Sequence, residues 1–312
     1  MSRGRSTRRD VLKLAAAAAA GVVANRVLAG APEPRMPTRD LGRTGFRVGL
    51  FSLGGQAAVE QPDNEAVAVP IVERALDLGV NYIDTSARYG GEARWSERYV
   101  GQVMKRRRRE AFLATKTHDR SRDGSLRLLE KSLRLLETDH VDLWQLHAMS
   151  TLADVEAVFA RGGAIEAFEK AREEKLVRFL GITGHSDPDV LAAAIRRFPF
   201  DNVLMAVNAA DPHHLPFQKT LLPLAVEKGM GIVGMKIPAR GRLLAALTMP
   251  EAMRYVLSLP VSTVIVGVDS ISQLEENVAT ARGFTPLQAP QLAALERKAE
   301  PVARQALWFR RA

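Results

Sequence analysis

Short apolar runs alternate with longer amphipathic stretches along most of this chain. The apolar runs are rich in Val, Ile, Leu and Phe, and they predict buried strands at Val48–Leu53, Asn81–Thr85, Phe112–Thr115, Val141–Gln145, Phe179–Thr183, Asn202–Val207, Gly231–Met235 and Thr263–Val266. Between them, apolar residues recur at helical spacing, as in Val67–Leu78, Gly124–Leu136, Ile165–Glu174 and Pro188–Arg196. Eight strands, each followed by a helix, predict an α/β protein with a (β/α)8 TIM barrel.

A doubly wound parallel sheet is the alternative architecture for alternating strands and helices. It would need a glycine-rich turn after an early strand, in the pattern Gly-x-Gly-x-x-Gly. The turn after the first predicted strand is Gly54-Gly55-Gln56-Ala57-Ala58, which does not have this pattern. The sequence therefore favours the barrel.

The segment before the first predicted strand indicates a small addition to the barrel. Thr38–Val48 has short alternating runs around Gly42 and Gly45, which predict an N-terminal β-hairpin. Residues 30–37 contain three prolines and predict a linker. We therefore expect one barrel domain over residues 38–312.

Two further segments belong to this domain. Leu287–Ala312 predicts a C-terminal helix, whose Trp308 and Phe309 either dock the tail or line the barrel mouth, docking being preferred. Lys105–Arg109 is a run of five bases before the third strand. We expect it on the N-terminal face as a solvated charged turn rather than a binding patch.

Charge and composition exclude little beyond a nucleic-acid binder. The chain has 312 residues, no cysteine and a formal net charge of +9. The first 29 residues hold six Arg and Lys against one acid, so they carry +5 of this charge. The remaining charge is ordinary for a surface of this size, and no nucleic-acid partner is expected.

The leader, residues 1–29, has the pattern of an export signal. Thr7–Lys13 contains Arg8-Arg9 and resembles a twin-arginine signal, followed by the apolar stretch Leu14–Ala24 and a small-residue cleavage pattern at residues 27–29. The apolar stretch is shorter than the ~20 residues that span a bilayer. We expect export through the twin-arginine translocation machinery to the periplasm, without stable membrane insertion after cleavage. An uncleaved basic tail or short anchor is the alternative.

Four polar residues lie at or just beyond the ends of three successive predicted strands. Asp84 ends the second strand and Tyr89 follows in its loop, Lys116 follows the third strand, and His147 follows the fourth. Strand carboxyl ends meet at the catalytic mouth of such a barrel. An ammonium beside a carboxylate is expected to keep both groups charged and to lower the pKa of a neighbouring phenol, which can then exchange a proton with a carbonyl oxygen. Singly, these residues also fit a cap, a surface charge and a core imidazole.

With these residues in place, the sequence resembles the aldo-keto reductase superfamily over about residues 38–283. The matching pieces, in the family's order, are Leu41–Gly45, Asn81–Thr85 with Tyr89-Gly90, Ser96-Glu97, Ala114–Lys116, Val141–His147, Gly181–Ser186 and Gln273–Asn277. The resemblance implies an oxidoreductase that transfers hydride between a nicotinamide cofactor and an aldehyde, ketone or sugar. It assigns Tyr89 as the general acid/base, Lys116 and Asp84 as residues that tune it, and His147 as a residue that orients the substrate carbonyl or assists proton transfer.

The same resemblance implies that NADPH, less often NADH, lies extended across the barrel mouth. The family usually has Ser-Asn after the fifth strand to hold the nicotinamide, where this chain has Thr183 and Gly184. His185 either substitutes for the missing side chain or caps the loop. A glutamine common on the sixth strand is replaced by Leu204, and Asn208 is the expected substitute.

The last two strands carry the remaining expected cofactor contacts. The aromatic residue that stacks on the nicotinamide is replaced by Gly234 or Met235, with Lys236 next; Met235 packs on the ring or in the core. After the eighth strand, NADPH-preferring relatives carry a base for the 2′-phosphate. This chain has Asp269 and no base there, which leaves NADPH and NADH both open. Further expected contacts are Gly267, Ser270, Gln273 and Asn277.

Two other functions remain as alternatives at this stage. A metal-dependent barrel hydrolase would use Asp84, His118, His147 and His185 as ligands, although the first strand lacks a His-x-His pair and His213-His214 is a poor chelate. A redox-sensing or partner-binding subunit would keep the fold and the cofactor but turn over negligibly. The intact set of four catalytic candidates favours the reductase.

Overall fold

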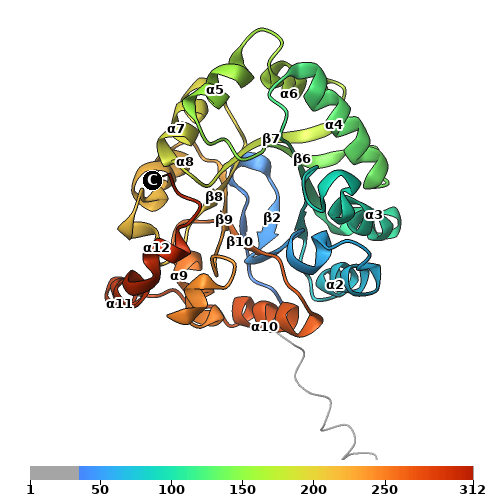
Figure 1. Cartoon of the computed structure of the whole chain (residues 1–312). Coiled ribbons are helices and arrows are strands. Elements are labelled where there is room, and N and C mark those ends of the chain that lie inside the picture. The colour runs from blue at the N-terminus through green and yellow to red at the C-terminus, as the bar shows by residue number, and fades with distance from the viewer. Residues whose placement is uncertain (1–34, 312) are drawn as a thin grey trace, which may run out of the picture. The chain divides into compact units, whose positions relative to one another are not determined.

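The computed structural model describes residues 35–311, which form a closed barrel of parallel strands ringed by helices (Figure 1). The predicted leader, most of the predicted linker and Ala312 lie outside the described residues. The barrel strands are β3 (Phe51–Gly54), β4 (Tyr82–Asp84), β5 (Phe112–Thr117), β6 (Val141–Leu146), β7 (Val177–Gly184), β8 (Asn202–Ala206), β9 (Gly231–Met235) and β10 (Thr263–Val266). They pair in chain order, and β10 closes on β3. The predicted (β/α)8 barrel is confirmed.

The helices cover the outside of the barrel, and their apolar faces pack on the strands (Figure 1). Their bounds agree with the predicted amphipathic stretches to within about two residues. The helices are α2 (Glu65–Asp77), α3 (Trp95–Arg107), α4 (Arg122–Leu135), α5 (Leu152–Phe159), α6 (Ala164–Glu173), α7 (Pro188–Arg197), α8 (Phe217–Glu227), α9 (Met249–Leu257), α10 (Ile271–Arg282), α11 (Ala289–Ala299) and α12 (Ala303–Ala306). No helix within residues 35–311 is long and apolar enough to cross a membrane.

The prediction of Val48–Leu53 as a single strand is wrong. Val48–Leu53 is divided between β2 (Arg47–Gly49), which pairs antiparallel with β1 (Thr38–Asp40), and β3. Leu50 lies between them and donates its N–H to the carbonyl of Pro37 at 3.0 Å. Because Leu50 and its neighbours are all buried, the apolar run is continuous and gives no sign of the break.

The β1–β2 hairpin closes the N-terminal end of the barrel. Its buried Leu41 and Val48 belong to the same apolar cluster as the interior residues of the barrel. Gly42, with φ +54°, approaches the backbone so closely that a Cβ atom would lie 2.1 Å from the amide nitrogen of Gly231. Only glycine fits there, so the predicted hairpin is confirmed and its turn residue has a packing reason.

The basic run Lys105–Arg109 forms the last turn of α3 and the start of the 3₁₀ turn Arg108–Glu110 before β5, on the N-terminal side of the barrel as expected. Its charges are mostly compensated by ion pairs. Lys105 pairs with Glu137 at 2.8 Å, and Arg107 pairs with Glu73 at 2.9 Å and with Asp77 at 2.8 Å. The run therefore ties neighbouring elements together and does not form a free anion-binding patch.

The C-terminal segment is not one helix, because α11 and α12 are separated by a 3₁₀ turn at Glu300–Val302. Pro301 lacks the N–H that a continuous helix would need. Beyond α12, Phe309 packs against the cluster inside the barrel, whereas Trp308 remains 47% exposed. Arg310 is buried, forms an ion pair with Asp211 and donates to the carbonyl of His185 at 3.0 Å. The tail is thus docked on the loops of the C-terminal end.

Candidate functional site

The C-terminal ends of β4, β5 and β6 bring the four catalytic candidates together. Asp84 ends β4, and Lys116 on β5 forms a fully buried ion pair with it and donates to the carbonyl of Thr85 at 2.7 Å. The Lys116 ammonium lies 4.7 Å from the centre of the Tyr89 ring. His147, one residue beyond β6, meets the same ring edge-on, with 5.7 Å between ring centres. The phenol is therefore between an ammonium and an imidazole, as the strand-end argument predicted.

The electrostatics of Tyr89 differ from the expectation. Burial raises the pKa of Tyr89 well above its ordinary value, and the carboxylates of Asp84 and Glu60 raise it further. Lys116 was expected to bring this pKa below its ordinary value, but burial of the phenol and the carboxylate of Asp84, which pairs with the ammonium, outweigh the attraction of Lys116. The phenol therefore stays protonated at neutral pH and is available as a proton donor.

The buried surroundings of the ion pair shift the pKa values of both partners toward their neutral forms. Burial raises the pKa of Asp84 and lowers the pKa of Lys116, and the attraction between the two groups opposes both shifts. Gln145 adds a hydrogen bond from its side-chain amide to Asp84 Oδ1 at 2.9 Å. The sequence reasoning missed Gln145, although the signal was present: it precedes His147 by two residues and so points to the same side of the strand.

His147 is held by a neighbour that the sequence reasoning also missed. Burial lowers the pKa of His147 well below its ordinary value, so the imidazole is neutral at pH 7. Its Nδ1 lies 3.0 Å from Ser86 Oγ, which accepts a hydrogen bond from the Arg88 N–H at 3.2 Å. The Ser86 hydroxyl proton is then available for Nδ1, and on this assignment Nε2 carries the ring proton. His147 can therefore donate a hydrogen bond to a substrate oxygen.

The Ser96-Glu97 motif at the start of α3 fixes the strand ends behind these residues. Ser96 and Thr85 hydroxyls are 2.8 Å apart, and Thr115 donates to Glu97 at 2.7 Å. Glu97 is fully buried and pairs with Arg94. Because Thr85 and Thr115 are direct neighbours of Asp84 and Lys116, α3 holds the ion pair in place from behind.

A cleft of about 640 Å³ leads from Asp84 and Tyr89 across the mouth. It passes between the loop after β3, which contains the 3₁₀ helix η2 (Ala57–Glu60), and the loops after β9 and β10. Six of the predicted cofactor residues line it, namely Met235, Lys236, Gly267, Asp269, Gln273 and Asn277. Glu60 and Arg240, which the sequence reasoning did not select, line it as well.

The residues of this cleft fit a dinucleotide. Asn277 is only 5% exposed, and its side-chain amide has no hydrogen-bond partner within residues 35–311. An amide offers a donor and an acceptor together, which matches the edge of an adenine base. Lys236 and Arg240 supply positive charge for phosphate groups. The phenol of Tyr89 lies at the end of the cleft opposite Asn277.

Comparison with known proteins agrees with this geometry. The model of the aldo/keto reductase family matches residues 47–251. The chain belongs to the aldo/keto reductase family. This reductase is 29% identical to the L-galactose dehydrogenase of Arabidopsis thaliana, over 86% of this chain and 96% of the relative. It is 25% identical to the NADP(+) aldo-keto reductase yakc of Schizosaccharomyces pombe, over 81% of this chain and 77% of the relative.

A solved structure shares the fold of the reductase closely. The holo form of aldo-keto reductase AKR11C1 from Bacillus halodurans superposes with a TM-score of 0.71 at 27% identity, covering 85% of this chain and 96% of that one. The reductase is an oxidoreductase that uses NADH or NADPH on carbonyl compounds or the corresponding alcohols. The predicted family, enzyme class and type of cofactor are confirmed.

The other predicted cofactor residues of the reductase do not line the cleft. Thr183 is fully buried and accepts a hydrogen bond from the Ala148 N–H at 3.1 Å, and a Cβ atom at Gly184 would lie 2.8 Å from the carbonyl oxygen of Met149. Asn208 is also fully buried and joins the Lys236 carbonyl to the Ala210 N–H. Thr183 and Asn208 therefore hold the mouth loops in place, and the close packing at Gly184 leaves no room for a side chain.

The remaining two residues lie near the mouth in other roles. Ser270 caps α10 by accepting the Gln273 N–H at 3.2 Å. His185 is partly buried with its ring centre 6.1 Å from that of Phe309, and burial followed by Lys236 and Lys116 lowers its pKa to about 3. His185 is therefore neutral at pH 7 and lies beside the substrate end of the mouth, next to the C-terminal tail.

A metal-dependent hydrolase is not favoured. Among residues 35–311, no group of three or more His, Asp, Glu or Cys side chains is arranged to hold a metal ion. His213 and His214 each place Nε2 on a backbone carbonyl, of Glu296 at 3.0 Å and of Arg311 at 2.7 Å. Because a carbonyl only accepts, both rings donate there, and they attach the C-terminal segment to the loop after β8.

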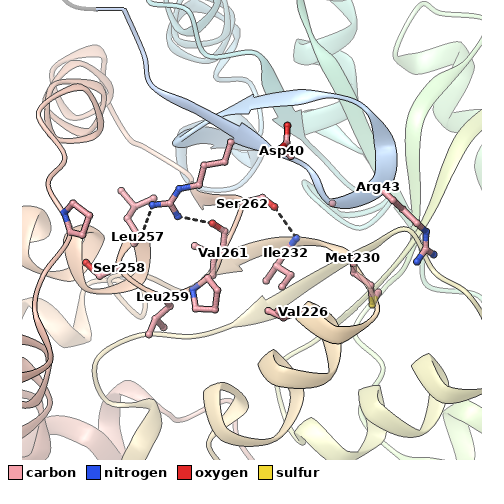
Figure 2. A pocket seen from close by; sticks show the side chains of 15 residues that line it. Asp40, Arg43, Val226, Met230, Ile232, Leu257, Ser258, Leu259, Val261 and Ser262 are labelled. Atoms are coloured by element: carbon pink, nitrogen blue, oxygen red, sulfur yellow. Dashed lines mark hydrogen bonds between the residues drawn. The ribbon is translucent and has the colours of Figure 1, made fainter.

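A second hollow, of about 840 Å³, lies at the opposite end of the barrel beside the hairpin (Figure 2). Its charged side chains are occupied: the guanidinium of Arg39 donates to the carbonyls of Val261 at 2.7 Å and Leu257 at 2.8 Å. Arg43 points away from the groove in Figure 2 and donates to the carbonyl of Lys228. Within residues 35–311, the basic side chains of this larger hollow are therefore bound to backbone carbonyls and are not available to a ligand.

Proposed function

We propose that the reductase reduces an aldehyde, ketone or sugar carbonyl with Tyr89 as the proton donor. The observation that supports this most directly is the protonated phenol of Tyr89 at the inner end of the cleft, between the Lys116 ammonium and the His147 ring. The bound nicotinamide cofactor supplies the hydride in reduction and accepts it in the reverse reaction. The residues of this chain hold the carbonyl and manage its proton.

Each residue has a defined part in the proton transfer. As the carbonyl carbon gains the hydride, negative charge develops on its oxygen, and the Tyr89 hydroxyl gives its proton to that oxygen. Nε2–H of His147 donates a hydrogen bond to the same oxygen and so orients the substrate. The Lys116 ammonium stabilises the phenolate that remains, and Asp84 keeps that ammonium charged in its buried position. In alcohol oxidation the proton returns to Tyr89.

The substitution Tyr89→Phe tests this role. Removing a general acid typically lowers the rate by about 10²–10⁴-fold, and we expect kcat to fall by that amount. The dissociation constants for NADH and NADPH should stay within about twofold, because Phe keeps the ring. Retention of more than about a tenth of the wild-type kcat would rule out Tyr89 as the proton donor.

We also propose that the reductase is exported through the twin-arginine translocation machinery and works in the periplasm. The support is the leader, with Arg8-Arg9, the apolar stretch Leu14–Ala24 and the small-residue pattern at residues 27–29. Export of an already folded protein suits an enzyme that takes up its cofactor in the cytoplasm. After cleavage, no stable membrane insertion is expected.

Cell fractionation tests the export proposal. The wild-type chain should appear in the periplasm of a bacterium that has the twin-arginine translocase and remain in the cytoplasm of a strain that lacks it. The double substitution Arg8→Lys with Arg9→Lys should also retain it in the cytoplasm, whereas Arg3→Lys with Arg5→Lys is a matched control and should not. Equal export with and without the translocase would contradict this route.

A further inference from the structure

We propose that the cleft prefers NADH over NADPH, and that Asp269 and Glu276 are the residues that discriminate. The inference deepens the proposed function and rests on it, because Tyr89 determines which end of the cleft receives the nicotinamide. The carbon that accepts the hydride carries the oxygen that Tyr89 protonates, so the nicotinamide must lie beside Tyr89. The adenosine end then lies at the other end of the cleft, against the loop after β10 and the first turns of α10.

The positive charges of the cleft come from one loop. Lys236 and Arg240 both follow β9 and are the cations among the residues that line the cleft. They lie toward the catalytic end, where both affect His185 and Arg240 affects Tyr89 electrostatically. Neither forms an ion pair within the described part of the chain. These two cations, neither of them in an ion pair among the described residues, match the pyrophosphate of a dinucleotide.

The adenosine end has the opposite charge. Asp269 and Glu276 line it with exposed carboxylates, and neither forms an ion pair within residues 35–311. The other polar side chains there, Gln273 and Asn277, are neutral. NADPH would bring a phosphate of about −1.5 to −2 charge next to these carboxylates. NADH has a ribose hydroxyl at the same position, from which a carboxylate can accept a hydrogen bond.

The protein itself uses part of the N–H groups at the beginning of α10, which weakens their attraction for a phosphate. A helix N-terminus attracts phosphate through free N–H groups, but the Gln273 N–H already donates to Ser270 Oγ at 3.2 Å. The Asp269 N–H donates to Gln273 Oε1 at 2.9 Å. The N–H groups of Asp269 and Gln273 are therefore occupied by the protein itself. The carboxylate of Asp269 also lies directly before the helix.

The test compares dissociation constants rather than activity. Binding of NADH and of NADPH is titrated separately by quenching of the native tryptophan fluorescence, with calorimetry as a second readout, in the wild-type protein and in variants. We expect NADH to bind at least tenfold more tightly at low salt. The double substitution Asp269→Asn with Glu276→Gln should reduce this ratio at least threefold, and Asp269→Arg should improve NADPH binding further.

Glu275→Gln is the matched control, because it removes the same charge from the same helix outside the cleft. Glu275 pairs with Arg74 of α2 at 2.7 Å and does not line the cleft. Its substitution should leave the ratio within twofold of the wild type. The preference of the wild type should also narrow as salt is added, because exposed charges are screened.

The outcomes separate the two proposals. NADPH binding as tightly as NADH, or more tightly, overturns the preference. A ratio that is the same in the double variant and the wild type overturns the role of Asp269 and Glu276. If neither nucleotide binds below about 1 mM, the proposed function itself fails, and the question of preference fails with it.

Discussion

At the N-terminal end of the barrel, the hollow beside the hairpin measures about 840 Å³, and at the C-terminal end the cleft measures about 640 Å³. Both contain basic side chains. In the first, the Arg39 guanidinium is occupied by the carbonyls of Val261 and Leu257 (Figure 2). In the second, Lys236 and Arg240 lack ion-pair partners within the described chain, and the Asn277 amide lacks a hydrogen bond there. Basic side chains left without protein partners among residues 35–311, rather than volume, distinguish the functional end from the structural end.

The sharpest test of this comparison separates stability from catalysis at the mouth. Lys116→Met leaves the Asp84 carboxylate buried without its partner, and we expect the free energy of unfolding to fall by about 3–5 kcal/mol in urea titrations. Adding Asp84→Asn removes the stranded charge and should recover part of that loss. Activity should stay absent in both variants, because neither has the ammonium beside Tyr89. Recovery of turnover in the double variant would contradict the assigned role of Lys116.

The corresponding change at the other end should affect stability alone. Arg39→Met removes two hydrogen bonds to backbone carbonyls, and the expected loss is about 1.5–3 kcal/mol of unfolding free energy. The kcat and KM values measured at a temperature where the variant is folded should equal those of the wild type. A changed KM would show that the hairpin end participates in binding and would remove the contrast between the two ends.

A smaller effect is expected from the residue that holds His147. Ser86→Ala removes the hydrogen bond to Nδ1 and leaves both tautomers of the ring accessible, so we expect kcat/KM for carbonyl reduction to fall about tenfold, or ~1.4 kcal/mol. ¹⁵N NMR of His147 should show the tautomer mixture, and Ser86→Thr, which keeps the hydroxyl, should restore the wild-type ring state. An unchanged tautomer in Ser86→Ala would contradict this account.

The smallest expected effect concerns pH and cofactor binding. Burial, followed by the charge of Arg240, lowers the pKa of Lys236 to about 8, so the side chain is charged below that value and neutral above it. The dissociation constant for NADH should be constant near pH 7 and rise a few-fold as the pH passes about 8. Lys236→Met should bind more weakly at pH 7 and lose this pH dependence. A pH dependence that persists in the variant would assign it to another group.

The sequence predicted the site residues at the strand ends better than those in the loops. Asp84, Tyr89, Lys116 and His147 could be predicted because strand ends converge wherever the chain forms a barrel. Ser86 could not, because its importance depends on the turn that brings its hydroxyl to His147. The cofactor residues were predicted from a family pattern, and the structure places Thr183 and Asn208 in internal hydrogen bonds instead of in the cleft.

The local breaks were equally hidden from the sequence. Leu50 interrupts a continuous apolar run, and no local signal shows that the residues before it pair with the hairpin while those after it pair with the barrel. The pKa of Tyr89 was misjudged for a related reason. Its direction depends on burial and on how completely Asp84 neutralises Lys116, and both are properties of the packed structure.

The pairing of β3 with β10 joins segments at opposite ends of the barrel sequence, with Val264 opposite Phe51. Pairing between segments so far apart in the chain is slow to form. We therefore expect the β3–β10 pairing to form late in folding. The cleft is lined on one side by the loop after β3 and on the other by the loop after β10, so a nucleotide lying in it bridges the seam. A ligand that binds only the folded chain adds about 2.7 kcal/mol of stability at 100 times its dissociation constant. The bound cofactor should therefore stabilise the pairing of β3 with β10. Its loss should shorten the lifetime of the folded enzyme as well as stop its reaction.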